Sequence, residues 1–128
     1  MFDLDRFNRL AFLEGRWIGA GPDGAPFHEE YAFTAPGTLT CTRHAGAAFA
    51  DPVDASTVTL VDGEVLSQWN GFRWRASALD DGHARFEPVD APSAFSWTRL
   101  ADGRIEVVQR WTDDAGAPQS MTMHLRRA

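Results

Sequence analysis

The chain has 128 residues, a length typical of one domain, here spanning 1–128. Its formal net charge is −6, and an acidic protein repels phosphate backbones, so we expect no nucleic-acid partner. Every basic residue other than histidine is arginine, which excludes lysine Schiff bases and Walker-type phosphate loops. The single cysteine, Cys41, excludes an intrachain disulfide.

The N-terminal segment, 1–13, predicts a short helix rather than a targeting signal. Leu4, Phe7 and Leu10 recur at helical spacing, and Gly15 is a suitable end for the helix. The segment lacks the apolar core of a signal peptide. No apolar run in the chain approaches the roughly 20 residues of a membrane span. We therefore expect a cytoplasmic protein that has no membrane partner.

Beyond Gly15 the alternation of apolar and polar residues predicts β-structure throughout. Turn signals recur about every eight to twelve residues, the spacing of a sandwich or barrel. Because short hairpins join nearly all the strands, and because closure removes exposed edges, we predict an all-β, up-and-down antiparallel barrel. The ten predicted strands span 15–20, 26–34, 38–45, 56–61, 65–70, 71–79, 83–88, 93–100, 104–112 and 119–127.

The register of each hairpin follows from placing apolar residues on one shared face. Between the second and third strands this places Tyr31 opposite Cys41 and Glu29 opposite Arg43. Cys41 then faces inward as a small hydrophobe. No inward histidine stands beside it to activate the thiol.

Two parts of the pattern are less regular. The turn after Leu79 returns the chain with Ala84 opposite Ala78. The stretch 46–54 is the longest irregular segment, and we expect a lid or portal there.

Polar side chains with inward parity are the most informative residues for function. An unpaired buried charge is very unfavourable, so each needs a partner, water or a ligand. One interpretation pairs Glu29 with Arg43. Arg99 has no inward acid opposite it, so it lies in solvent at the barrel mouth or binds a carboxylate inside a cavity. The inward polar set is Glu29, Arg43, Ser67, Arg99 and Gln109.

Large aromatic residues share the inward parity and either fill the core or line a ligand site. A ten-stranded barrel is wider than an eight-stranded one, and eight strands already enclose one small ligand. Some interior space is therefore expected. The inward aromatic set is Trp17, Tyr31, Trp69, Trp74, Trp97 and Trp111.

The helix followed by Gly15-Arg16-Trp17 resembles the opening of the lipocalins, in the calycin superfamily. In that family the Trp lies at the closed end of the barrel, and an Arg late in the last strand packs across it. The resemblance implies this barrel-closing structural role for Trp17 and Arg127, the latter stacking on the indole.

The stretch Leu10–Gly21 also resembles nitrobindins and small lipocalin-like bacterial proteins of unknown function. The second resemblance continues through Arg85-Phe86-Glu87-Pro88 and Ala94-Phe95-Ser96-Trp97, and it implies a barrel around a small-molecule cavity. Nitrobindins hold haem on a His in a late strand, which would be His124 here. The register instead turns His124 outward, opposite Glu106, so we expect no cofactor.

No motif predicts a catalytic or metal site. His28 and His44 face each other across one hairpin, with Glu30 nearby, but we expect that face to be solvated surface. Fatty-acid-binding proteins, which the barrel resembles in strand number, use an interior Arg to bind a carboxylate. This chain lacks their second helix, so that role remains a hypothesis for the interior arginines.

Several functions remain open at this point, since a fold alone does not choose among them. The first is binding of a small hydrophobic ligand, with or without a carboxylate group. The second is an enzyme acting on a hydrophobic substrate, with Glu29 as the titratable group. A haem-binding barrel and a filled barrel that serves as an interaction module are further alternatives. A homodimer through outer strand faces is compatible with all of them. The predicted ligand-binding residues are Tyr31, Arg43, Trp97, Arg99 and Gln109.

Overall fold

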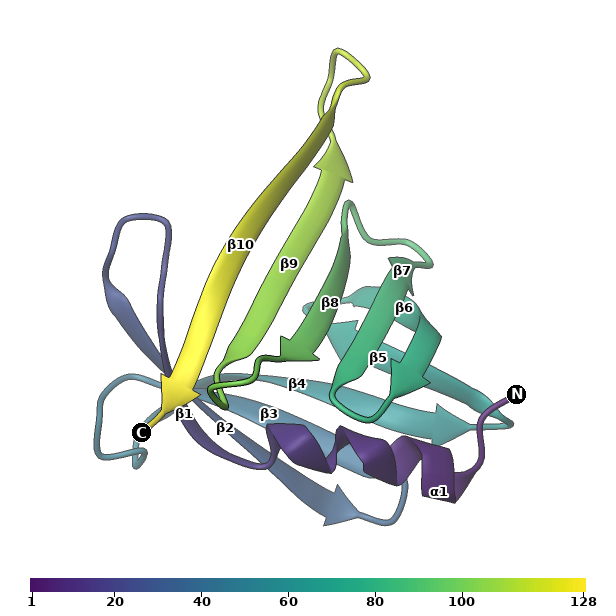
Figure 1. Cartoon of the computed structure of the whole chain (residues 1–128), viewed down its shortest axis with the longest axis horizontal. Helices are drawn as coiled ribbons and strands as arrows, with labels where there is room; N and C mark the ends of the chain where they lie inside the picture. The colour runs from purple at the N-terminus through teal and green to yellow at the C-terminus, as the bar shows by residue number, and fades with distance from the viewer.

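The strands close into one antiparallel barrel in a computed structural model that describes all 128 residues (Figure 1). Each strand pairs with its neighbours in sequence, and β10 pairs with β1 to complete the ring. The predicted ten-stranded up-and-down barrel is confirmed. The strands are β1 (Gly15–Ala20), β2 (Pro26–Ala35), β3 (Thr38–His44), β4 (Pro52–Val61), β5 (Glu64–Trp69), β6 (Phe72–Asp80), β7 (His83–Pro88), β8 (Ala94–Arg99), β9 (Ile105–Thr112) and β10 (Pro118–Arg127).

The predicted register between β2 and β3 is observed, with Tyr31 opposite Cys41 and Glu29 opposite Arg43. Because side chains alternate across a strand, these residues share the inner face of the barrel. A short connection between adjacent strands leaves few alternative pairings, which is why local pattern was sufficient here.

Two predicted details are wrong. A bulge between Ala76 and Ala78 shifts the register, so Ala84 pairs with Leu79 instead of Ala78. The shift turns Leu79 inward, where it is fully buried, and this removes more apolar surface from water than an alanine would. In addition, β4 begins at Pro52 and not at residue 56, so the last part of the expected irregular stretch 46–54, residues 52–54, is strand.

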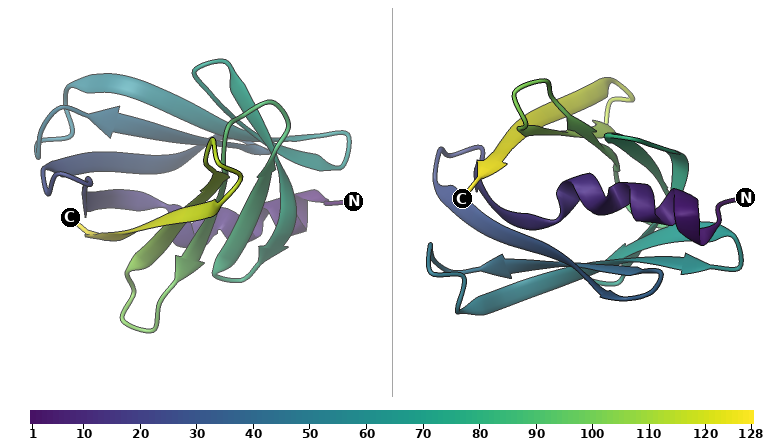
Figure 2. Two further views of the ribbon diagram at one scale, coloured as in Figure 1. Left: turned by 90° about the horizontal axis from the view of Figure 1, so that it is seen from above. Right: turned by 60° about the horizontal axis from the view of Figure 1, so that its bottom comes forward.

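The N-terminal segment lies across one end of the barrel, as Figure 2 shows. A single helical turn, α1 (Leu4–Phe7), begins where the Asp3 side chain accepts a hydrogen bond from the amide of Arg6 at 2.8 Å. It continues as a 3₁₀-helix, η1 (Asn8–Leu13), and the two together form the short N-terminal helix that was predicted. The buried side chains that close this end of the barrel are Phe7, Leu10, Phe12 and Leu13.

No helix of the structure has both the length and the apolar character needed to cross a membrane. The helical segment is instead held to the barrel by Arg6, whose guanidinium donates to the carbonyl of Leu79 and to the carboxylate of Asp80. Both acceptors belong to the end of β6, so this contact places the segment over the β6–β7 turn.

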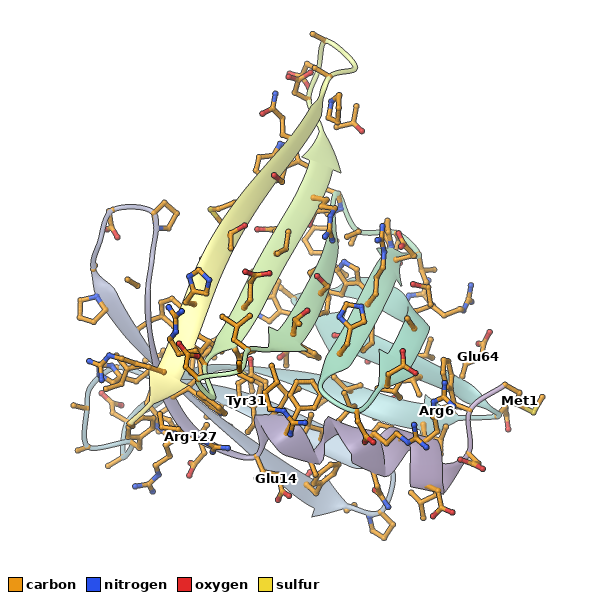
Figure 3. The ribbon with its side chains drawn as sticks, viewed as in Figure 1. Met1, Arg6, Glu14, Tyr31, Glu64 and Arg127 are labelled. Carbon is orange, nitrogen blue, oxygen red and sulfur yellow. The ribbon has the colours of Figure 1, made fainter.

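The junction of the first and last strands is built around Trp17. Its ring is fully buried, and its Nε1 donates to the carbonyl of Leu13 at 2.8 Å. The Arg127 guanidinium lies 4.0 Å from the centroid of that ring and donates to the carbonyl of Glu14. Figure 3 labels Arg127 at the end of β10 and Glu14 after the helical segment. Gly15 has a φ of 121°, and a side chain there would collide with Arg127. The helical segment, the first strand and the last strand are therefore joined through contacts with Trp17.

The stacking of Arg127 predicts a measurable contribution to stability. We expect Arg127→Ala to lower the free energy of unfolding by about 1 kcal/mol, the size of a partly desolvated cation–π contact. Arg126 is the matched control, because it is exposed, next in the chain and opposite Ile18 on the other face. Urea denaturation of both variants measures the effect. Equal losses for the two would show that the stacking contributes nothing.

Candidate ligand-binding cavity

A cavity of about 370 Å³ lies inside the barrel, toward the end opposite the helical segment. Its lining includes Phe27 at the start of β2, Trp69 at the end of β5 and Phe72 at the start of β6. Those strand ends are the ones that the N-terminal segment leaves uncovered. Trp69 is partly exposed, so the cavity meets solvent there.

One wall of the cavity is apolar and largely aromatic. Phe95 is its centre, with ring centroids 5.4 Å from Trp74 and 5.1 Å from Trp97 in edge-to-face arrangements. Trp97 also contacts Tyr31 edge-to-face across the interior, at 6.0 Å between centroids. Further lining residues of this wall are Val107, Met123 and Leu125.

A small polar group lies at the edge of this wall, contributed by β9 and the segment before β8. The Trp74 indole donates to the carbonyl of Ser93 at 2.7 Å. The Gln109 amide donates to the Ser93 hydroxyl at 3.0 Å. Because the amide of Gln109 also carries an acceptor oxygen, it can bind one polar group of a ligand and orient it.

The opposite wall carries an ion pair whose carboxylate is mostly buried and whose guanidinium is partly exposed. Arg43 Nη2 lies 3.2 Å from Glu29 Oε2, with side-chain exposures of 47% and 14% respectively. The Tyr31 hydroxyl donates to Glu29 Oε1 at 3.3 Å. Two donors therefore hold the buried carboxylate in place, which is the condition under which burial of a charge is tolerated. The pairing of Glu29 with Arg43 is the one that strand register predicted.

Tyr31 and Cys41 are held in their neutral forms. Burial is the largest cause that raises the pKa of Tyr31 well above its ordinary value, and the nearby Cys41 and Glu29 raise it further. Burial also raises the pKa of the Cys41 thiol, with Glu29 as the second cause. A thiol that resists ionisation is a poor nucleophile, so this wall is suited to hydrogen bonding and not to covalent chemistry.

The mouth of the cavity includes a second acid, Asp54. Its Oδ2 accepts a hydrogen bond from the Trp69 indole at 2.6 Å, and its Oδ1 accepts one from the amide of Ala55. Arg43 reaches the mouth as well, with its guanidinium 4.7 Å from the centroid of Phe27. Glu29 and Asp54 against Arg43 leave the lining with one net negative charge.

Four of the five residues predicted to contact a ligand line this one cavity: Tyr31, Arg43, Trp97 and Gln109. Arg99 does not. It is exposed at the helix-covered end, where its amide donates to the carbonyl of Gly82 at 2.7 Å. Strand parity gave the correct face for Arg99 but carried no information about its height along the barrel.

Sequence reasoning missed Asp54, which it assigned to the irregular stretch 46–54. The missed signal was parity, because Asp54, Ser56 and Val58 alternate on one face, and Asp54 stands opposite Arg43 once β4 is extended.

His44 corrects another expectation, since it is not solvated surface. The loop between β3 and β4 folds over it, leaving it 8% exposed, with its ring centroid 5.6 Å from that of Phe49. Its Nε2 lies 3.4 Å from Oε1 of Glu30, and the other oxygen of that carboxylate, Oε2, accepts a hydrogen bond from Arg16 Nε at 2.9 Å. His28 contacts Phe49 from the other side. No group of three or more His, Cys, Asp or Glu in the structure is arranged to hold a metal ion.

No histidine lines the cavity. His124 is 40% exposed on the outer face, with its Nε2 3.4 Å from a carboxylate oxygen of Glu106. The outward register predicted for this residue is therefore observed. A haem iron inside the barrel would find no imidazole ligand.

Comparison with known proteins adds little to this geometry. No protein-family model and no curated protein matches the chain. Among solved structures, the chain is similar to a redesigned β-barrel at 14% sequence identity and a TM-score of 0.37, covering 94% of this chain and 96% of that one. A likeness at this level carries no functional argument, so the function must be argued from the cavity.

The buried phenol and thiol predict a loss of stability in alkaline solution. Both pKa values are raised on folding, so the stabilisation is complete below the ordinary values, near 9 for Cys41 and 10 for Tyr31, and is lost as the pH rises above them. We expect the free energy of unfolding to fall by about 1.4 kcal/mol per pH unit for each group.

Urea denaturation between pH 8 and pH 11 measures this dependence with little interference, because the chain has no lysine, one tyrosine and one cysteine. The double variant Tyr31→Phe, Cys41→Ala is the control and should lose the dependence. A wild-type stability that stays constant over this range would show that water reaches both groups.

Proposed function

We propose that this protein binds a small, mainly apolar molecule inside the barrel. The observation that carries the proposal is the cavity of about 370 Å³, which lies within the usual range of small-ligand sites. Its walls are mostly aromatic and aliphatic, and Glu29, Tyr31 and Gln109 offer a few polar groups at fixed positions. Many apolar contacts and few oriented polar ones are typical of a ligand site. A lipocalin-like mode of binding, with the ligand enclosed by strands, is part of this proposal.

The alternatives receive less support. A filled interaction module would leave no space of this size in the barrel. The enzyme hypothesis depended on Glu29 standing in the pocket without a partner, and Glu29 is instead paired with Arg43. A haem-binding barrel would need an inward histidine, and His124 faces outward.

The structure also gives no support to a carboxylate group on the ligand. Arg99 lies outside the cavity, and Arg43 is engaged by Glu29 and by the ring of Phe27. A ligand carboxylate would have to compete with Glu29 for the guanidinium. The proposal therefore keeps the apolar ligand without the acidic group.

Titration with N-phenyl-1-naphthylamine, a neutral apolar dye that fluoresces when it leaves water, tests the proposal. We expect saturable binding by the wild-type protein. Met123→Trp should abolish it, because Met123 lines the cavity and the larger side chain fills the space. Thr122→Trp is the matched control. It introduces the same residue one position away, and Thr122 is exposed on the outer face.

Near-ultraviolet circular dichroism of both variants establishes that each is folded. Absence of dye binding by the wild-type protein, or equal binding by the two folded variants, would overturn the proposed function.

A further inference from the structure

The charges around the cavity differ in how well they are compensated. Glu29 is paired with Arg43, which also lies against the ring of Phe27. Asp54 has no such partner: its two hydrogen-bond donors are the Trp69 indole and the Ala55 amide, both neutral. No arginine or histidine nitrogen forms an ion pair with it. The cavity therefore has one uncompensated charge, a carboxylate at its mouth.

An uncompensated carboxylate at the mouth favours a cation over an anion. An anion entering the cavity would meet two acids against one base, and it would approach Asp54 and Glu29 to reach Arg43. A cation would be attracted by the net negative lining. Each carboxylate has more acceptor sites than the two hydrogen bonds it receives, so a further donor can be accepted.

The aromatic residues at the mouth favour the same sign. Phe27, Trp69 and Phe72 line this end of the cavity, and the faces of such rings attract cations. Phe27 already holds one cation in this way, the guanidinium of Arg43 at 4.7 Å. An ammonium group beside Asp54 would find a counter-ion there, with the aromatic side chains of Trp69 and Phe72 in the same part of the lining, while an apolar body reaches the wall around Phe95.

We propose that the ligand is a small amine, with its ammonium group at the mouth beside Asp54 and its apolar body among Trp74, Phe95 and Trp97. This inference rests on the proposed function, since it names the chemical class that the same cavity takes. It assigns to Asp54 the role of selecting the head group.

Three probes that share one ring system separate the head group from the apolar body. They are 1-naphthylmethylamine, a cation at pH 7, 1-naphthylmethanol, which is neutral, and 1-naphthoic acid, an anion. Their affinities are measured by displacement of N-phenyl-1-naphthylamine in low-salt buffer. We expect the amine to bind about two- to fivefold more tightly than the alcohol, the effect of a partly exposed ion pair, and the acid to bind most weakly. Added salt should reduce the difference.

The variant Asp54→Asn removes the charge and keeps an oxygen that can accept from the Trp69 indole. It should bring the amine and the alcohol to equal affinity and strengthen binding of the acid. Asp62→Asn is the matched control, because it changes the net charge of the chain equally at the β4–β5 turn, near the other end of the barrel. Its φ of 51° is one that asparagine tolerates. This control should retain the preference of the wild type.

The outcomes distinguish this inference from the proposed function. If the alcohol binds as tightly as the amine, or if the acid binds most tightly, the cavity is a ligand site and the inference about the head group is wrong. If Asp54→Asn retains the preference for the amine, Asp54 is not the source of that preference, and the inference is overturned. If neither the dye nor any of the three probes binds, both proposals fail.

Discussion

Closure of the sheet is the constraint on which the rest of the structure depends. Once β10 pairs with β1, every inward side chain must be packed, hydrogen-bonded or left beside a cavity. The N-terminal segment fills one end with Phe7, Leu10 and Leu13, and Trp17 joins that segment to the first strand. No second helix covers the other end, so the interior there remains open. The cavity is thus a consequence of closing ten strands with only one short helical plug.

The charged residues Glu29 and Arg43 are tolerated on the inner face because, together with Tyr31, they form one connected group. Glu29 accepts from both Arg43 and Tyr31, so its burial costs less than that of an isolated carboxylate. In this arrangement Glu29 neutralises Arg43, the positive charge that an acidic ligand would need. Asp54 stands outside the group and remains partly in solvent, where a free carboxylate is stable. Because Glu29 is paired with Arg43 and Asp54 has no such partner, the lining of the cavity carries a net negative charge.

Strand parity alone assigns most of the cavity residues to the inner face, but it fails where exposure depends on the position along the barrel or on a covering loop. Tyr31 and Trp97 face inward as predicted and contact each other across the barrel. Arg99 and Trp111 have the same parity and nevertheless are exposed, because each lies at a strand end beyond the enclosed interior. His44 failed for the opposite reason: a loop residue, Phe49, covers an outward position that alternation alone marks as solvent-facing.

The sequence by itself determined the strands, most of their registers, the closed all-β fold and the pairing of Glu29 with Arg43. These features depend on alternation and on short turns between neighbouring strands, which are local in the chain. Only the tertiary structure decided the height of each side chain along the barrel, the cover over His44, the place of Asp54 at the mouth and the volume left inside. Those properties depend on the stagger accumulated around the closed sheet and on contacts between distant segments, which no local pattern encodes.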